Sequence, residues 1–277
     1  MLQGISVYLD YYGLIEQPFN ITPNPRFLFY SAKHREAFNH LLYGIRERKG
    51  FVQITGEVGA GKTTLCRALL EALGNNFSTA LILNPILDPD QLIKAIAMEF
   101  GLEVKGMDRL ETVAEINKFL LDEAERGRDA VLIIDEAQNL TNNLLEQVRL
   151  LSNLETDERK LLQIVLMGQP ELRERLNDHS LRQLKQRITV RYHLRSLNRL
   201  EVEQYVQHRL SVSGAKKGPY FTWAALWRVY RYAKGIPRII NAICDKCLLA
   251  GFVQQRDQID FSLVGTAIRE LEGRMHA

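Results

Sequence analysis

The sequence is poor in cysteine, carries little net charge and contains no long hydrophobic run. Its three cysteines in 277 residues are too few for the disulfide framework of a small secreted domain. Cys244 and Cys247 have C-x-x-C spacing without a second pair or a zinc-spaced histidine, so we expect them to be buried helix residues. No uncharged apolar run approaches the about 18 residues that span a bilayer, and no signal-peptide pattern opens the chain. These absences favour a cytoplasmic protein.

The bulk composition is that of an ordinary globular protein. A formal net charge of +3 is too small to indicate nucleic-acid binding by itself. With 46% hydrophobic and 25% charged residues, the chain is long enough for one large domain, or for a large and a small one. Its function therefore has to be inferred from local motifs.

The segment from Gly56 to Thr63 matches the phosphate-loop pattern G-x-x-x-x-G-K-[ST] at every fixed position. Its glycines let successive backbone N–H groups point into one concavity, and the helix that follows adds its positive end. Lys62 is expected to reach the β- and γ-phosphates of ATP, and the Thr63 hydroxyl to bind Mg²⁺. The predicted nucleotide contacts are Gly56, Glu57, Val58, Gly59, Ala60, Gly61, Lys62, Thr63 and Thr64.

Strand and helix patterns alternate from Phe51 onwards. Short apolar strands are expected at 51–55, 79–83, 130–135, 161–167 and 188–192. Helices are expected between them at 63–73, 89–100, 110–126 and 144–154. This alternation predicts an α/β domain with a parallel five-stranded sheet. After Leu197 no strand is expected, and helical patterns at 199–210, 222–233, 236–252 and 261–273 predict a small all-α domain.

An apolar strand at 131–134 runs directly into two acids, Asp135 and Glu136. A parallel strand delivers its last residues to the crevice where phosphate binds. Asp135 is therefore expected to hold Mg²⁺, directly or through water, and Glu136 to polarise the attacking water as general base. Two solvated acids at an exposed strand end are the alternative. The phosphate loop earlier in the chain favours the catalytic interpretation.

Polar residues also follow two other predicted strands. Gln169 fits a role in orienting water or sensing the γ-phosphate. Asn84 fits a role in holding Glu136 in an unproductive rotamer until a partner arrives. Each residue fits a simple loop cap equally well.

Basic residues gather around the last predicted strand, at Arg182, Lys185, Arg187 and Arg191. Phosphoryl transfer gains from an arginine that a neighbouring subunit supplies. Arg187 is the first choice for this finger and Arg182 the second, with a solvated basic helix end as the alternative. Arg238 opens a helix of the small domain and is expected to reach back to the γ-phosphate.

The first 32 residues form a segment of prolines and aromatic side chains. The prolines disfavour helix, and so many exposed aromatics would be insoluble. We therefore expect a strap packed on the core of the α/β domain, with or without a share in the pocket for the nucleotide base. The predicted domains are the strap at 1–32, an ATPase domain at 33–197 and a helical lid at 198–277.

Together these motifs resemble the AAA+ ATPases, and more narrowly the ExeA/GspA group linked to bacterial type II secretion. The resemblance covers nearly the whole chain from Tyr8. Its particular segments are Tyr11-Tyr12-Gly13-Leu14, Pro18-Phe19, Pro23-Asn24-Pro25 with Phe27, Ser31 with His34, Asp135 to Leu140, Gly168 to Leu172, and Gly235 to Arg238.

The resemblance implies a RecA-like ATPase domain with a helical lid, in oligomers that hold ATP between subunits. It implies that Lys62 and Thr63 are the Walker A residues and that Asp135 and Glu136 are the Walker B residues. It further implies that Gln169 is sensor 1 and Arg238 sensor 2.

Members of the secretion group help to place the secretin pore through peptidoglycan. The resemblance thus implies self-assembly, a membrane or secretion-system partner, and a place in the cytoplasm or at the cytoplasmic face of the inner membrane. Longer members continue into a membrane span and a peptidoglycan-binding domain that this sequence lacks, which leaves the secretion role open. AAA+ ATPases of transposition look similar in the same segments, so a DNA-bound regulator is the alternative, and a nucleotide switch with little hydrolysis is a third.

Overall fold

The computed structural model describes residues 8–22, 24–156, 159–215 and 218–273. Its chain divides into two compact units. The α/β unit consists of Ala32–Glu57 and Leu65–Leu194, and the helical unit of Met1–Ser31, Val58–Thr64 and Arg195–Ala277. Residues 1–7 and Pro23 of the predicted strap lie outside the described residues.

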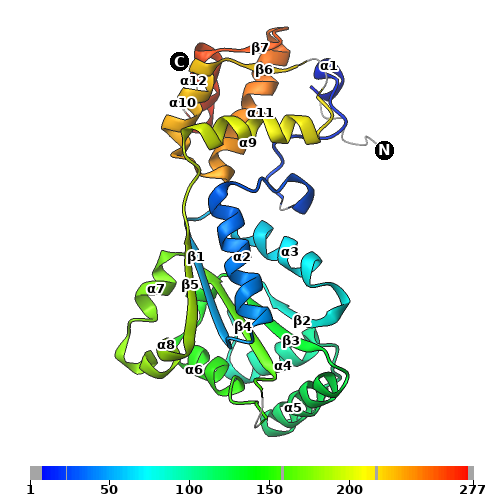
Figure 1. Cartoon of the computed structure of the whole chain (residues 1–277). Helices are drawn as coiled ribbons and strands as arrows, with labels where there is room; N and C mark the ends of the chain where they lie inside the picture. Colours follow the sequence, from blue (N-terminus) through cyan, green and yellow to red (C-terminus); the bar gives the residue numbers. More distant parts are fainter. Residues whose placement is uncertain (1–7, 23, 157–158, 216–217, 274–277) are drawn as a thin grey trace. The chain divides into compact units, whose positions relative to one another are not determined.

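The α/β unit is built on a parallel five-stranded sheet in the order β2-β3-β4-β1-β5 (Figure 1). Its strands are β1 (Phe51–Gly56), β2 (Phe77–Ile82), β3 (Asp129–Ile134), β4 (Leu162–Gly168) and β5 (Ile188–Leu194). All five predicted strands are present, with ends shifted by one or two residues. Because the strands are parallel, their carboxyl ends meet at one edge of the sheet.

Helix α2 (Ala32–Arg46) precedes the first strand. The helices between the strands are α3 (Lys62–Leu73), α4 (Pro89–Glu99), α5 (Arg109–Glu125), α6 (Asn142–Leu151), α7 (Pro170–Arg175) and α8 (Arg182–Arg187). Helices α4 and α5 each begin at a capping box, in which an aspartate side chain and the third helical residue satisfy each other's backbone N–H groups. The six-residue helices α7 and α8 were not expected from the sequence.

Both faces of the sheet are covered. On one face, Leu132 and Leu166 belong to an apolar core shared with α4, α5 and α6. On the other face, Val52 packs against Gly44 of α2. The central strands β1, β3 and β4 are buried on both faces, which explains why their sequences read as continuous apolar runs.

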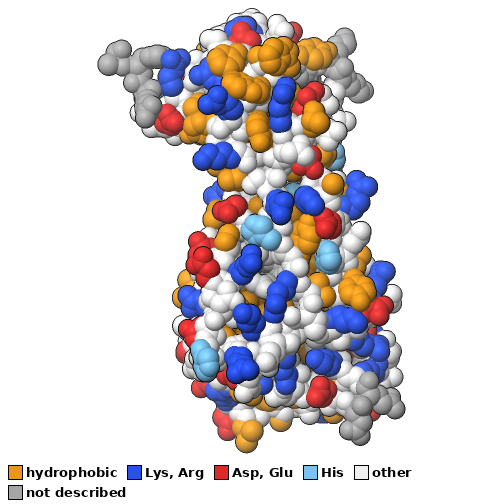
Figure 2. All heavy atoms as spheres, turned by 60° about the vertical axis from the view of Figure 1, so that its left-hand side comes forward, with side chains coloured by type: hydrophobic (Ala, Val, Ile, Leu, Met, Phe, Trp, Pro, Cys, Tyr) orange, Lys and Arg blue, Asp and Glu red, His pale blue; other side chains and the backbone are white. Residues whose placement is uncertain are grey.

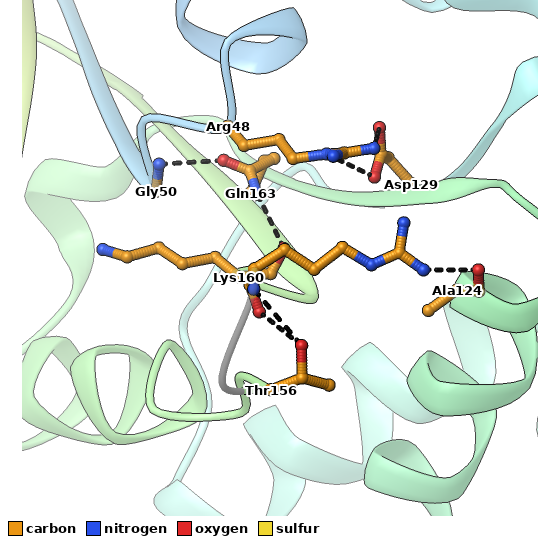
Figure 3. Close-up of polar contacts among 8 residues, drawn as sticks. Arg48, Gly50, Ala124, Asp129, Thr156, Lys160 and Gln163 are labelled. Atoms are coloured by element: carbon orange, nitrogen blue, oxygen red, sulfur yellow. Dashed lines mark hydrogen bonds and ion pairs between the residues drawn. The ribbon is translucent and has the colours of Figure 1, made fainter.

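A polar network closes the amino-terminal edge of the sheet (Figure 3). Gln163 of β4 is 1% exposed and accepts a hydrogen bond from the backbone of Gly50, 2.8 Å away. Arg48 binds both carboxylate oxygens of Asp129 at 3.0 and 3.2 Å. These contacts join the residues that precede β1 to the starts of β3 and β4, and so help to fix the strand register.

Glu123 of α5 is a buried carboxylate that links this helix to β2 and to the turn before β3. It accepts hydrogen bonds from Arg128 at 2.5 and 2.6 Å, from Arg126 at 3.0 Å, and from Ser78 of β2. The bonds from Arg128, followed by those from Ser78 and Arg126, lower the pKa of Glu123 from its ordinary 4.5 to about 2, although burial opposes the shift.

Glu123→Gln is expected to lower the free energy of unfolding by about 3 kcal/mol, because it removes a buried charge that pairs with two arginines. Since the folded pKa lies below the unfolded value, this stabilisation is complete above pH 4.5 and is lost as the pH falls toward 2. Urea unfolding at pH 7 and below pH 4.5 should show the difference between wild type and variant shrinking in acid. Glu125→Gln, at an exposed position of the same helix, serves as control. Equal stability of Glu123→Gln and wild type at pH 7 would contradict the assignment.

The helical unit contains α9 (Arg199–Val212), α10 (Trp223–Ala233), α11 (Pro237–Val253) and α12 (Phe261–Leu271), with a short helix α1 (Leu9–Tyr12). The expectation of no strand after Leu197 was wrong, because β6 (Tyr220–Phe221) and β7 (Gln258–Ile259) form a short parallel pair. Cys244 and Cys247 are buried, unpaired thiols of α11, as expected. No helix among the described residues is both long enough and apolar enough to cross a membrane.

The N-terminal segment packs on the helical unit, and the expected packing on the ATPase core was wrong. Tyr8, Tyr12 and Phe19 are buried in one apolar core with α9 to α12. The buried Arg209 of α9 donates hydrogen bonds to the backbone carbonyls of Pro18 and Asn20. The physical reason is that the aromatic residues need apolar surroundings, and the apolar core of the helical unit supplies them.

Candidate nucleotide-binding and hydrolysis site

The predicted phosphate loop connects the end of β1 to the start of α3. Gly59 and Gly61 have φ angles of +77° and +99°, a backbone conformation that favours glycine. Helix α3 begins at Lys62, whose side chain is only 5% exposed, while Thr63 and Thr64 follow in the first helical turn. Backbone amides at a glycine-rich turn and a helix start are the groups that bind phosphate oxygens.

Gly59 also contacts the start of α11 within the helical unit. The backbone N–H of Arg238 donates to the Gly59 carbonyl at 3.3 Å. A Cβ atom on Gly59 would lie 2.5 Å from the Cβ of Arg238, so a larger residue would have to displace the helix start. Arg238 itself is exposed. The structure therefore places this predicted sensor next to the loop.

Two acids, Asp135 and Glu136, directly follow β3 (Asp129–Ile134). Asp135 is 2% exposed, and its Oδ1 accepts a hydrogen bond from the backbone N–H of Glu136 at 2.9 Å. Glu136 has a φ angle of +51°, in the left-handed region that non-glycine residues rarely adopt. Such strained backbone gathers at functional sites, where the surrounding structure holds it in place.

Two glutamines hold the Glu136 carboxylate. Its Oε2 accepts hydrogen bonds from Gln138 Nε2 at 2.6 Å and from Gln169 Nε2 at 3.2 Å. Gln138 Oε1 in turn accepts from the backbone N–H of Gln169 at 3.0 Å. A Cβ on Gly168 would lie 2.8 Å from Gln138 Oε1, so this glycine lets the amide come close. Because β3 and β4 are neighbours, the cluster spans adjacent strand ends.

The cluster contains Gln138, which was not predicted from the sequence, and lacks Asn84, which was. Gln138 was not predicted as a site residue, although the segment Asp-Glu-Ala-Gln contains it. Asn84 lies exposed in the loop after β2. The contact with Glu136 that was expected of Asn84 is made by Gln138 and Gln169.

The predicted magnesium ligands fit the chemistry of that ion. Among the described residues, no three His, Cys, Asp or Glu side chains are grouped so as to hold a metal ion. Thr63 has a hydroxyl and Asp135 has a carboxylate, and each is an oxygen donor of the kind that Mg²⁺ binds. Mg²⁺ binds mainly to phosphate and water and takes few protein ligands.

The two candidate finger arginines differ in their surroundings. Arg187 Nη1 donates to the hydroxyl of Ser152, at the end of α6, at 2.7 Å. Ser152 is 1% exposed and donates to the carbonyl of Arg149. Arg182, at the start of α8, is exposed and takes part in no ion pair within the part of the chain that the structure describes.

Comparison with known proteins agrees with this arrangement. Residues 45–176 match the family model of an AAA domain. The chain is 46% identical, over 268 residues, to general secretion pathway protein A of Aeromonas hydrophila. The aligned region is 96% of this chain but only 49% of the relative, so the chain spans about half the length of that protein.

Solved structures show the same fold. The ORC2 protein of Aeropyrum pernix, determined in ADPNP and ADP complexes, aligns with a TM-score of 0.68 at 17% identity, over 92% of this chain and 71% of that one. The Drosophila ORC bound to DNA contains a chain that aligns with a TM-score of 0.70 at 18% identity, over 98% and 67% of the two chains. At these identities the likeness is one of fold.

The fold class predicted from the sequence is confirmed, as a RecA-like parallel sheet followed by a helical part. The phosphate loop, the paired acids after β3 and the AAA domain match together support nucleotide binding and ATP hydrolysis. The chain therefore contains an AAA domain and is similar, over almost all of its length, to general secretion pathway protein A of A. hydrophila.

Proposed function

We propose that this chain couples ATP hydrolysis to its own assembly into oligomers, and that the Glu136 cluster controls the hydrolytic step. The observation that carries this proposal is the position of the Glu136 carboxylate, bonded to Gln138 and Gln169 at the end of β3. A general base has to be free to accept a proton from water. The two amide N–H donors make the Glu136 carboxylate less available to accept that proton. Breaking these hydrogen bonds therefore activates Glu136 as a base.

The nucleotide contacts follow from the loop. The backbone of residues 56–61 surrounds the phosphates, with Lys62 on the β- and γ-phosphates and Thr64 in the same helical turn. The Thr63 hydroxyl and the Asp135 carboxylate hold Mg²⁺, which neutralises charge on the phosphates when bound. Gln169 contacts the γ-phosphate and Glu136, so the position of Glu136 depends on the nucleotide. Arg238 contacts the γ-phosphate from the helical unit.

We assign the trans finger to Arg182 rather than to Arg187, since the Arg187 guanidinium already has a partner in its own chain. An exposed arginine at the start of α8 is free to face the nucleotide of a second copy. The transition state for phosphoryl transfer gains most from a cation that arrives with the neighbouring subunit.

Arg182→Ala is expected to leave nucleotide binding unchanged and to lower turnover by on the order of 1,000-fold. Arg187→Ala is expected mainly to lower stability, by about 1 kcal/mol, because it removes a hydrogen bond to a buried hydroxyl. Mixing Arg182→Ala with Glu136→Gln subunits tests the trans role, because mixed assemblies contain sites with both groups intact. Steady-state ATPase assays across mixing ratios should show partial recovery. Absence of recovery at every ratio would exclude Arg182 as the trans finger.

The cellular role that we propose is assembly of a secretion apparatus at the cytoplasmic face of the inner membrane, with a secretion-system protein as partner. The support is the 46% identity to general secretion pathway protein A over almost all of this chain. A DNA-bound regulator is the alternative, favoured by the fold that the chain shares with the DNA-bound ORC. A duplex-DNA complex that forms with ATP at low salt and weakens steeply as salt rises would favour this alternative.

A further inference from the structure

The α/β unit contains a cavity that the nucleotide loop does not line. It has a volume of about 360 Å³ and lies between β1 and β5 and the segment that holds α7 and α8. The residues that matter for its chemistry are Gln53 and Thr55 of β1, Arg173 of α7, Lys185 of α8, and Arg191 and His193 of β5. Its size falls within the range of small-molecule sites.

The charged side chains that line the cavity are all positive. Arg173, Lys185 and Arg191 line it, and no aspartate or glutamate among the described residues does. None of the three forms an ion pair within the described part of the chain. Figure 2 shows lysine and arginine side chains gathered on this face of the α/β unit. Uncompensated cations around a concave surface attract an anion.

The acidic residues of the same segment do not neutralise the cavity. Glu171, Glu174 and Asp178 are exposed and lie outside its lining. Asp178 is turned onto its own turn, where it accepts hydrogen bonds at 2.8 Å from both the backbone N–H and the hydroxyl of Ser180. Because these acids lie outside the lining, the cations of the cavity remain available to a ligand.

The floor of the cavity is polar, although it belongs to a sheet of apolar strands. Gln53 and Thr55 are 4% and 3% exposed on the central strand β1. They pair in register with Arg191 and His193 of β5, and Thr55 Oγ1 lies 3.0 Å from His193 Nδ1 in a hydrogen bond. Burying polar groups in a central strand costs free energy. A ligand that forms hydrogen bonds with these side chains would offset that cost.

One wall is also fixed in place. Arg191 Nη2 donates to the backbone carbonyl of Lys185, which ties the end of α8 to β5. The guanidinium is thus held at the cavity by its own chain, with other N–H groups left for a ligand. A cavity whose walls are held before binding loses less entropy when it binds.

We propose that this cavity binds a small molecule that carries a phosphate group. Guanidinium groups match the geometry of phosphate oxygens, and an ammonium, a hydroxyl and an imidazole add further phosphate contacts. Three cations in one cavity suit a dianion better than a single carboxylate. Phosphate could be supplied free in solution or as an ester, and the cavity has room for the ester's organic part.

The test is calorimetric titration of the full chain, with ADP and Mg²⁺ present in saturating amounts so that the nucleotide loop is filled. The probes are inorganic phosphate, glycerol 3-phosphate and acetate, at constant ionic strength. A saturable site is expected for the phosphate probes but not for acetate. Tighter binding of glycerol 3-phosphate than of phosphate would identify an ester as the ligand, and the reverse order would identify the free ion.

The variant Arg173→Gln/Lys185→Gln is expected to weaken phosphate binding by about tenfold or more, because it removes two charged contacts. Both side chains are exposed, so folding should be retained. Lys105→Gln/Lys118→Gln removes the same charge from exposed positions outside the cavity and should bind as wild type. The proposal fails if wild type shows no saturable phosphate site, if acetate binds equally well, or if the cavity variant keeps wild-type affinity.

Discussion

Lys62→Ala is expected to weaken nucleotide binding and to lower ATP turnover by on the order of 100-fold or more. Lys62 is 5% exposed at the first residue of α3, directly after Gly61, which like Gly59 has a left-handed backbone. A cation in that position compensates charge on the β- and γ-phosphates, where charge moves in the transition state. Alanine removes that cation and leaves the backbone amides alone. Steady-state ATPase rates and titration with a fluorescent ATP analogue measure both effects.

A matched control separates this effect from a general loss of charge. Lys105→Ala changes an exposed lysine of the same α/β unit and should retain both binding and turnover. Thermal unfolding of each variant shows whether the fold is kept. Full binding and turnover in a folded Lys62→Ala variant would overturn the assignment of the loop as the nucleotide site.

Glu136→Gln is expected to lower turnover by on the order of 1,000-fold while nucleotide affinity stays within error of wild type. Glutamine has nearly the same shape, and its carbonyl oxygen can still accept from Gln138 and Gln169. It cannot take a proton from water, so only the chemical step is affected. Single-turnover hydrolysis and nucleotide titration distinguish the chemical step from binding.

The control for this variant is Glu47→Gln, which neutralises an exposed glutamate just after α2. It should hydrolyse ATP at the wild-type rate. Unchanged turnover in Glu136→Gln would show that another group activates water. Reduced nucleotide binding in that variant would point instead to a role of Glu136 in holding the phosphate loop.

Features that depend on contiguous residues were predictable. The phosphate loop is a run of eight residues whose glycines and lysine act through local backbone geometry, and the structure shows that geometry at Gly59, Gly61 and Lys62. The strands of the sheet are apolar runs that need burial on both faces, so their order with helices predicted the fold class. Helices α7 and α8 were not predicted, because six residues are too few to establish a helical period.

Features that depend on contacts between distant residues were not predictable in the same way. Gln138 becomes a site residue because the turn after β3 brings its amide to the end of β4, where Gly168 leaves room for it. The sequence contains the glutamine but does not reveal its contact with the end of β4. The strap was placed on the wrong unit because aromatic composition indicates that burial is needed and says nothing of which surface provides it.

The way the two ends of the chain share one core also constrains its biosynthesis. Tyr8 donates a hydrogen bond to Asp245, 237 residues later, and its ring lies in the same core as α11 and α12. A ribosome releases the α/β unit in full once Leu194 has emerged, whereas the helical unit has to wait for its last helices. Until then the first aromatic residues have no partner surface, and they are the part of the nascent chain most in need of protection by a chaperone.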